Sequence, residues 1–331
     1  MSEDTWQLAG GDELVPGLVL LEDLGGGTVF EAWLAHDERL LAPVVVKVIR
    51  PSRVDDPATR YAFEREVDLL SALNHPGIAR LYAYADGDRP HLVLEHVEGP
   101  NLSRLISKHG ALPPHQLYAV ALELASALHY LTGQGYCHLD VKPSNVIAGA
   151  PARLIDLSVA MSHQEAAVLD HPVGSDEYMA PEQCISPPTV RHPRESLSPP
   201  TVRHPRESPL PPTVRHPRES PLPPTARHPR RGESAGDGAP GPASDVWGLG
   251  ATLFRAAAGH RAFDRDRTWP QLTDEPAALP RGIDPRFASI LADCLQRDPT
   301  QRPTPAQVAD RLGPLIADLP TARLAGFSLR R

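Results

Sequence analysis

Residues 138–145 read His-Leu-Asp-Val-Lys-Pro-Ser-Asn, and the triplet Asp156-Leu-Ser158 follows eleven residues after Asn145. Asp140 can accept the proton of an attacking hydroxyl, and Lys142 can neutralise charge on a transferred phosphoryl group. Asn145 and Asp156 supply the hard oxygen ligands that Mg²⁺ prefers when phosphate oxygens and water complete its shell. A lone aspartate is more often a solvated turn residue, but the joint pattern indicates phosphoryl transfer.

A second candidate residue lies upstream, in the β-branched run 44–49. This run predicts a buried strand, in which the ammonium of Lys47 is costly unless a carboxylate pairs with it. Asp56 followed by Pro57 predicts the start of a helix, and Glu66 on that helix is the best candidate partner. Taken alone, a lysine in a strand is more often an edge residue whose ammonium lies in water, so the pairing depends on the other motifs.

The order of the predicted elements gives the fold class. Short β-like runs occupy residues 14–50, a further strand is predicted at 91–95, and apolar residues at helical spacing predict a helix over 114–133. The chain from Asp245 onward is predicted to be mostly helical. A β-rich first third followed by a helical remainder predicts an α+β protein with two unequal lobes.

Residues 186–231 differ from the rest of the chain, because S-x-x-P-P-T-V-R-H-P-R-E recurs there in four near copies. Such a Pro- and Arg-rich segment has too few apolar residues to offset the entropy of ordering, so we expect disorder. Its nine Arg and three Glu give a net charge of +6, whereas the whole chain carries −8. The repeat is either a site that recruits a partner protein or a duplication without a selected role.

Composition excludes several classes of protein. The chain of 331 residues is acidic overall, which argues against a nucleic-acid partner. Cys137, Cys184 and Cys294 lie far apart without any C-x-x-C spacing, which favours a reducing, cytoplasmic location. The N-terminus is acidic, and no apolar stretch is long enough to span a bilayer, so we expect neither export nor a membrane anchor.

Taken together, the motifs resemble those of the eukaryotic-type Ser/Thr protein kinase family, in its bacterial branch. The string at 138–145 matches H-x-D-x-K-P-x-x-N, and Val45-Val-Lys47 and Glu66 match the family's strand lysine and helix acid. Residues 174–182 resemble the segment that ends in A-P-E. The resemblance implies a bilobal protein kinase-like fold, ATP and Mg²⁺ as cofactors, and a protein substrate that the sequence does not identify.

The resemblance also implies a role for each matching residue. The catalytic residues are Asp140 and Lys142, and the metal ligands are Asn145 and Asp156. The structural residues are Glu182, Asp245 at the start of a helix, and Arg302, which would pair with Glu182. Leu94 would be the gatekeeper, Glu95 and Val97 would offer hinge backbone groups, and Val29, Val45 and Ile147 would enclose adenine. The expected ATP site comprises Gly25, Gly26, Gly27, Val29, Val45, Lys47, Glu66, Leu94, Glu95, Val97 and Ile147.

The resemblance divides the chain into five parts. These are an acidic N-terminal segment at 1–13, the kinase domain at 14–185 and again at 241–315, the repeat insertion at 186–240, and a C-terminal tail at 316–331.

The sequence departs from the family pattern at three places. The Gly-rich loop is about three residues short before Thr28, which reduces its cover over phosphates. Leu139 replaces the Arg that reads a phosphorylated activation loop, so we expect activity independent of loop phosphorylation. Ser158 replaces a glycine and loses that residue's freedom at positive φ.

These departures leave two alternatives open. One is a pseudokinase that binds nucleotide or partners without turnover, and the other is a scaffold that acts through the repeat. Lys142 together with Ser175 resembles Ser/Thr kinases more than tyrosine kinases.

Overall fold

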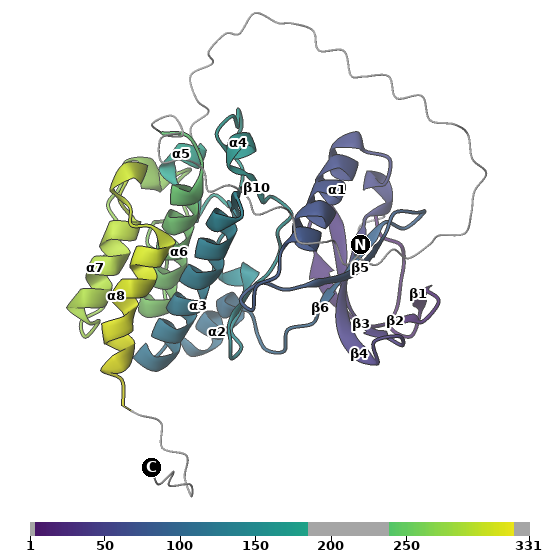
Figure 1. The fold of residues 1–331 in the computed structure, drawn as a ribbon, viewed down its shortest axis with the longest axis horizontal. Helices are drawn as coiled ribbons and strands as arrows, with labels where there is room; N and C mark the ends of the chain where they lie inside the picture. Colours follow the sequence, from purple (N-terminus) through teal and green to yellow (C-terminus); the bar gives the residue numbers. More distant parts are fainter. Residues whose placement is uncertain (1–3, 185–237, 321–331) are drawn as a thin grey trace, which may run out of the picture.

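The computed structural model describes residues 4–184 and 238–320, which form two lobes side by side (Figure 1). One lobe is a sheet with a single long helix, and the other consists mainly of helices. The predicted bilobal α+β fold is therefore confirmed. Residues 186–231, for which the sequence predicts disorder, lie outside the described residues.

The first lobe contains one six-stranded antiparallel sheet with the order β1-β2-β3-β4-β6-β5. Its strands are β1 (Glu13–Val15), β2 (Leu18–Gly26), β3 (Phe30–Asp37), β4 (Ala42–Ile49), β5 (Leu81–Ala85) and β6 (His91–Glu95). Side chains alternate between the two faces of a strand, so Val44, Val46 and Val48 pack into one apolar cluster. The same alternation directs Val45 and Lys47 to the opposite face.

Helix α1 (Pro57–Ala72) begins where the sequence predicts it. Asp56 caps the helix by accepting a hydrogen bond from the Ala58 N–H at 3.3 Å, and Pro57 occupies the first turn, where no N–H is needed. Phe63 and Leu70 are buried in the core that α1 shares with the sheet, and Glu66 is buried on the same helix. The helix thereby carries one carboxylate into an apolar interior.

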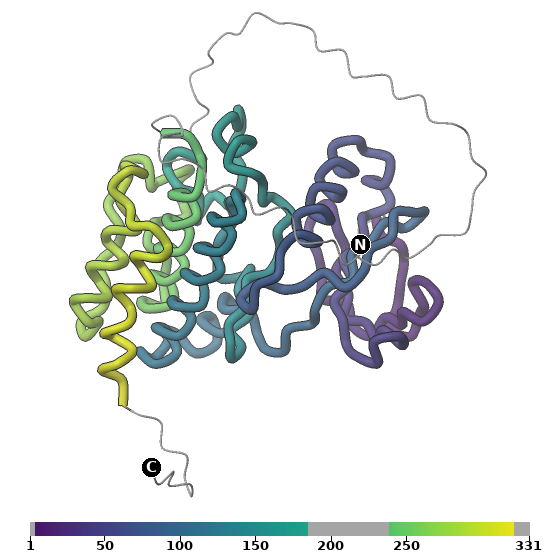
Figure 2. Tube along the Cα trace, in the orientation of Figure 1, coloured from purple at the N-terminus to yellow at the C-terminus, as the bar shows by residue number. Residues whose placement is uncertain are grey.

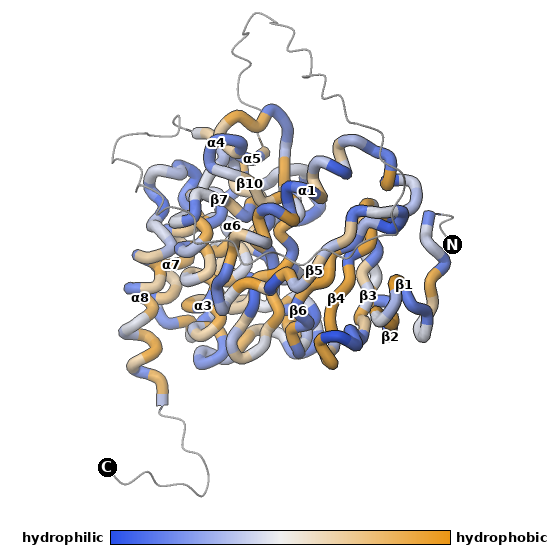
Figure 3. The backbone as a smooth tube through the Cα atoms, turned by 45° about the vertical axis from the view of Figure 1, so that its right-hand side comes forward, coloured by the Kyte–Doolittle hydropathy of each residue, from blue (hydrophilic) through white to orange (hydrophobic). Residues whose placement is uncertain are grey.

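The second lobe is built around two long helices: α3 buries one apolar face, and α6 is buried along most of its length. Its helices are α2 (Leu102–His109), α3 (Pro114–Gly133), α4 (His163–Ala166), α5 (Pro181–Cys184), α6 (Pro242–Ala258), α7 (Pro285–Cys294) and α8 (Pro305–Ala317). A Cβ at Gly250 would lie only 2.7 Å from the Cys294 Cβ, so α6 can approach α7 this closely only with glycine there. Figure 3 shows hydrophobic residues running along the interior elements of both lobes.

Two short two-stranded antiparallel sheets follow α3. Strand β7 (Tyr136–Cys137) pairs with β10 (Met161–Ser162), and β8 (Val146–Ile147) pairs with β9 (Arg153–Leu154). The β8–β9 hairpin follows the 3₁₀ turn Pro143–Asn145, so Asn145 and Asp156 lie at its two ends. The chain path in Figure 2 shows this region passing between the two lobes.

The edges of the predicted domains differ in detail from the observed elements. Residues 4–12, expected as a separate acidic segment, lie against the sheet, where Trp6 packs on its apolar cluster. Helix α8 ends at Ala317, two residues into the predicted tail. The two ends of the chain around the repeat meet, because the Ser244 hydroxyl donates to Glu182 at 2.7 Å. Within residues 4–184 and 238–320 no helix is long and apolar enough to cross a membrane.

Candidate active site

A cavity of about 790 Å³ lies between the lobes, lined by strands β2–β4, α1, the 95–101 connection and the segment after Ile155. Ten of the eleven residues expected at the ATP site line it: Gly26, Gly27, Val29, Val45, Lys47, Glu66, Leu94, Glu95, Val97 and Ile147. Gly25 is outside the lining, and its N–H donates to the Asp23 carboxylate at 2.7 Å. The cavity has the size and the apolar walls of a small-molecule site.

Lys47 lies at the centre of a buried cluster of charges. Its Nζ is 2.9 Å from Glu66 Oε1 and 2.9 Å from Asp156 Oδ1, so three distant parts of the chain meet there. Burial would lower the pKa of Lys47, but the two carboxylates outweigh burial and raise it, so the ammonium stays charged. The predicted contact between Lys47 and Glu66 is confirmed, whereas the contact with Asp156 was not foreseen.

The two carboxylates of this cluster differ in environment. Burial raises the pKa of Glu66 despite the neighbouring Lys47, because its side chain is only 2% exposed. Burial also acts to raise the pKa of Asp156, but the Lys47 ammonium lowers it well below the ordinary value. Asp156 is 37% exposed on the cleft side. It is therefore an ionised carboxylate available to a ligand, whereas Glu66 serves to hold the lysine.

The hinge lies at the end of β6. The Glu95 N–H donates to the Arg80 carbonyl at 2.8 Å, so this N–H is already used within the protein. Leu94 is buried in the strand, and Val97 lines the cavity two residues beyond Glu95. The backbone groups of Val97 are thus the better placed of the predicted hinge groups for an adenine.

The loop that contains Asp140 is tied together by its own side chains. Lys142 Nζ is 2.7 Å from Asp140 Oδ2, and Asn145 Nδ2 donates to the same oxygen at 3.2 Å and to the Asp140 carbonyl at 3.0 Å. The other oxygen, Oδ1, is buried and has no hydrogen-bond partner among the described residues. A buried acceptor without a partner is costly in a structural role, so Oδ1 is suited to receive an incoming hydroxyl.

Asp245 fixes the backbone of the loop that contains Asp140. Its carboxylate accepts the backbone N–H of His138 at 2.8 Å and that of Leu139 at 2.7 Å. Burial raises the pKa of Asp245 to about 6. Leu139 has a φ of 62°, which is strained for a residue with a side chain, so the two hydrogen bonds hold the backbone turn that presents Asp140. The sequence predicted the position of Asp245 but not this role.

Asn145 and Asp156 fit a divalent cation. Asn145 uses its amide nitrogen on Asp140, which leaves the amide oxygen for a cation, and Asp156 is ionised and open to the cleft. In the described part of the chain no cluster of three or more His, Cys, Asp or Glu side chains is arranged for a metal. Two hard oxygen ligands suit Mg²⁺ that arrives with phosphate, since this ion keeps waters and phosphate oxygens as its other ligands.

The Asp156-Leu-Ser triplet adopts a different backbone from the one expected. The positive φ of this triplet, 65°, lies at Asp156, and Ser158 does not share it. Ser158 therefore does not need the freedom of the glycine that it replaces. Leu157 is buried in the main core.

The segment after this triplet is held by packing. Leu139 belongs to an apolar cluster with Cys137, Met161 and Ala166, against which Leu169 and Val173 pack. Ser162 caps α4, since its hydroxyl bonds to Glu165 at 2.7 Å and accepts the Glu165 N–H at 3.2 Å. Leu139 thus contributes apolar contact at the position where the family places a phosphate-reading Arg.

A second, more open groove of about 590 Å³ begins beside Lys142 and runs along residues 174–178. Lys142 Nζ donates to the Ser175 hydroxyl at 2.6 Å, so this lysine joins the loop of Asp140 to the wall of the groove. This polar groove begins at Lys142, whose ammonium also contacts the Asp140 carboxylate, and it is a suitable place for a peptide substrate.

Glu182 and Arg302 form the predicted pair at the base of this lobe. Arg302 donates to both oxygens of Glu182, at 2.7 and 2.8 Å, and both side chains are buried. The guanidinium also donates to the carbonyls of Ala243, Gln296 and Arg297. The pair fixes the A-P-E segment to the start of α6, as expected from the sequence.

The sequence of this chain is similar to those of known proteins. A profile of the protein kinase domain matches residues 18–192. The serine/threonine-protein kinase PknB of Mycobacterium leprae is 33% identical over 48% of this chain and 27% of the relative. PknB of Mycolicibacterium smegmatis is 32% identical over 49% and 28%, and the serine/threonine-protein kinase pkn2 of Myxococcus xanthus is 31% identical over 50% and 21%. The matched part of the chain thus spans between about a fifth and little more than a quarter of the length of these relatives.

Proposed function

This chain belongs to the protein kinase family, and on that basis we propose that it is a Ser/Thr protein kinase that transfers the γ-phosphoryl group of Mg·ATP to a protein hydroxyl. One observation carries the proposal: Lys47, 2.9 Å from both Glu66 and Asp156, lies in the wall of a nucleotide-sized cavity. A charged lysine held between two carboxylates at such a cavity is suited to phosphate oxygens.

The cavity walls would bind the nucleotide. Val45 and Ile147 lie in its lining from opposite lobes and provide apolar surfaces for a flat base. Lys47 would bind phosphate oxygens, and Glu66 would keep its ammonium in place. When bound, Mg²⁺ neutralises charge on the phosphates, and Asn145 and Asp156 are the residues that would hold it.

Asp140 would handle the proton. The substrate hydroxyl donates its proton toward Oδ1, the buried oxygen without a partner, while the hydroxyl oxygen forms a bond to the γ-phosphorus. The bond from that phosphorus to the bridging oxygen of the β-phosphate breaks, and the leaving group is ADP. Lys142, 2.7 Å from Oδ2, supplies positive charge near the transferred group.

The contact of Lys142 with Ser175 supports Ser/Thr specificity. These two residues carry the resemblance to Ser/Thr kinases, and their 2.6 Å hydrogen bond joins the two walls of the peptide groove. The apolar cluster around Leu139 supports the further proposal that the enzyme needs no loop phosphorylation, because packing already holds that segment.

The test is transfer of label from γ-labelled ATP to the protein itself or to a generic substrate in the presence of Mg²⁺. Asp140→Asn should lower the rate about 10²–10⁴-fold, the usual contribution of a general base, while leaving nucleotide binding largely intact. A wild-type rate no higher than that of this variant would support a pseudokinase instead.

A further inference from the structure

The connection between β2 and β3 is short, and the residue that follows β4 contacts it through its side chain. Only residues 27–29 link the two strands. Gly26 has a φ of 156°, and a Cβ there would collide with the Phe30 carbonyl, so the backbone is folded tightly at this point. Arg50 follows β4 directly and is 16% exposed in its side chain.

Arg50 holds two carbonyls of this connection. Its Nε donates to the Gly27 carbonyl at 2.8 Å, and its own N–H donates to the Val29 carbonyl at 2.9 Å. In a trans peptide group the carbonyl and the next N–H point in opposite directions. Since the Gly27 carbonyl points to Arg50, the Thr28 N–H points away from Arg50, and Thr28 lines the nucleotide-sized cavity.

The other side of the guanidinium is bound by the N-terminal segment. Arg50 Nη1 donates to the Asp4 carbonyl at 2.8 Å and lies 4.0 Å from Glu31 Oε1. Trp6 donates its backbone N–H to the same Glu31 oxygen at 2.9 Å. One guanidinium therefore connects the N-terminal segment to the Gly-rich loop.

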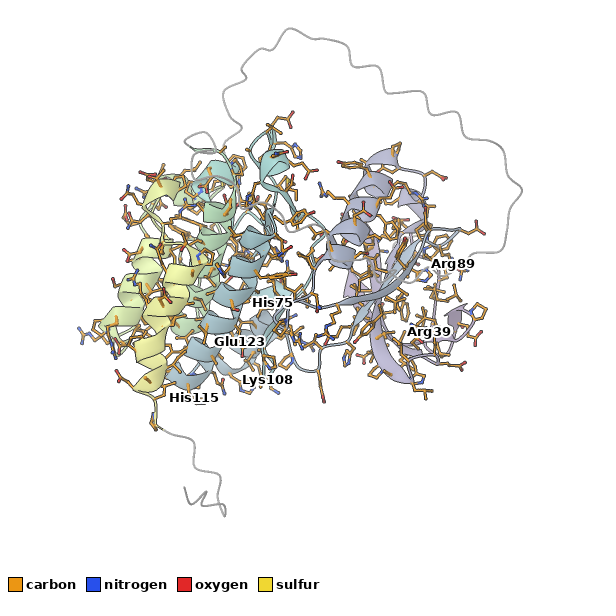
Figure 4. The ribbon with its side chains drawn as sticks, in the orientation of Figure 1. Arg39, His75, Arg89, Lys108, His115 and Glu123 are labelled. Atoms are coloured by element: carbon orange, nitrogen blue, oxygen red, sulfur yellow. The ribbon has the colours of Figure 1, made fainter. Side chains whose placement is uncertain are left out.

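The N-terminal segment itself is well anchored. The Trp6 indole N–H donates to the Ile49 carbonyl at 2.8 Å, and the Asp4 carboxylate accepts from both the N–H and the hydroxyl of Ser52. Arg89, in the turn between β5 and β6 (Figure 4), lies over the Trp6 ring at 5.1 Å. These contacts fix Asp4 and Trp6 beside the end of β4, where Arg50 lies.

We propose that Arg50 is a positioning residue that orients the Thr28 N–H toward the nucleotide phosphates, and that the segment Asp4–Trp6 holds Arg50 in place. The proposal rests on the proposed function, since it names a determinant of nucleotide affinity at the same site. A shortened loop covers phosphates less completely. Because Arg50 fixes the carbonyls of Gly27 and Val29, the loop cannot rotate the Thr28 N–H away from the cavity, and less entropy is lost when a phosphate binds.

The experiment measures both the KM for ATP and kcat, together with the dissociation constant of a non-hydrolysable Mg·ATP analogue by calorimetry. Arg50→Ala should raise the KM and the dissociation constant about tenfold while changing kcat less than about threefold, because the residue acts on binding and not on the hydroxyl. Arg50→Lys should give an intermediate value, since an ammonium reaches fewer acceptors than a guanidinium. The control is Arg53→Ala, whose exposed side chain is 4.0 Å from Asp56 and should change neither constant.

A double variant tests the route through the N-terminal segment. Trp6→Ala should raise the dissociation constant less than Arg50→Ala does, and it should add nothing in the Arg50→Ala background, because both act through one contact. Melting curves identify any variant that fails to fold, in which case Arg50→Lys and Trp6→Ala decide. Equal dissociation constants for Arg50→Ala, Arg53→Ala and wild type would overturn the proposal. If the wild type shows no turnover but Arg50→Ala still weakens binding of the analogue about tenfold, the result supports this proposal and refutes the proposed function.

Discussion

Two ion pairs join distant parts of the chain, Arg302 with Glu182 within the second lobe and Lys47 with Asp156 across the cavity, and they differ in how far a ligand can reach them. Arg302 and Glu182 are 0% and 4% exposed, and the guanidinium donates to both carboxylate oxygens and to three carbonyls. Lys47 is 12% exposed and its partner Asp156 is 37% exposed toward the cavity. The first pair is closed to ligands, whereas the second has a charged edge that a ligand can reach.

This difference in exposure distinguishes the ion pair of Arg302 with Glu182, which is structural, from that of Lys47 with Asp156, which can bind a ligand. A buried charge with every hydrogen bond satisfied contributes rigidity, and its loss leaves an uncompensated partner. A buried lysine beside an exposed, ionised carboxylate keeps binding capacity that the protein itself does not use. We therefore expect changes at Glu182 and Arg302 to alter stability, and changes at Asp156 to alter turnover.

The largest expected effect on stability is that of Arg302→Ala. Removing the guanidinium leaves Glu182 buried without its partner, which should lower the free energy of unfolding by about 3–5 kcal/mol. Chemical denaturation followed by circular dichroism measures the change. The matched control is Arg286→Ala, because Arg286 is 52% exposed and its pairs with Asp284 and Asp318 lie in solvent. Equal denaturation midpoints for the two variants would refute the distinction.

The second prediction concerns the pH dependence that Asp245 gives to the loop containing Asp140. Burial raises the pKa of Asp245 to about 6, above its ordinary value of 3.8, so the folded state binds the extra proton between about pH 4 and 6. The contribution of Asp245 to stability therefore falls as pH rises through this window. Turnover should rise with pH over the same window. Protonation of the Asp245 carboxyl weakens the hydrogen bonds that it accepts from the backbone N–H groups of His138 and Leu139, and these hydrogen bonds hold the loop of Asp140. Rate and melting profiles of wild type and Asp245→Asn test this, and a rate that is flat across pH 6 in wild type would contradict it.

A smaller effect is expected from removing the repeat. Deleting Pro187 to Gly236 joins ends that already meet, since Ser244 donates to Glu182 at 2.7 Å. Closing a long loop costs little more than closing a short one, so the melting temperature should change by no more than a few degrees. Transfer to a small peptide should persist. Loss of folding on deletion would show that the repeat belongs to the folded domain.

The smallest effect is expected from phosphatase treatment. The Ser162 hydroxyl caps α4 and the Ser175 hydroxyl accepts from Lys142, so both are already used within the segment that Leu139 packs against. Treated and untreated protein should have equal initial rates. A lag that disappears after preincubation with ATP, with phosphate found on Ser162 or Ser175, would contradict the prediction.

Much of the site could be predicted because its residues stand in recognisable strings or satisfy a simple electrostatic need. A charged Lys47 in a buried strand requires a carboxylate, and the next helix offers Glu66 on its apolar face. The pair of Glu182 with Arg302 followed from family resemblance, and the structure bears it out. The start of helix α1 at Pro57, capped by Asp56, could be predicted because a capping signal is local.

The residues that the sequence did not reveal act on backbone groups far away in the chain. Asp245 binds the N–H groups of residues 138 and 139, which are 107 and 106 positions away and carry no side-chain signal. The contact of Arg50 with the Gly27 carbonyl is likewise absent from any sequence pattern, because it also involves a backbone group. Backbone carbonyls and N–H groups are the same in every residue, so only the folded geometry shows which of them a side chain reaches. The expected strain at Ser158 was misplaced because backbone dihedral angles depend on the neighbours, and the positive φ fell on Asp156.

The most direct test compares Asp156→Asn with wild type in two measurements on the same preparations, label transfer from γ-labelled Mg·ATP and the free energy of unfolding. Lys47 keeps Glu66 as its partner in this variant, so the loss of stability should be clearly smaller than that of Arg302→Ala, which leaves Glu182 buried without a partner. Transfer should fall by at least about 10²-fold, because under the proposed function this carboxylate would hold the cation at the phosphates and the variant removes its charge. Equal transfer rates in the two proteins, or a variant that loses stability as Arg302→Ala should, would contradict the account.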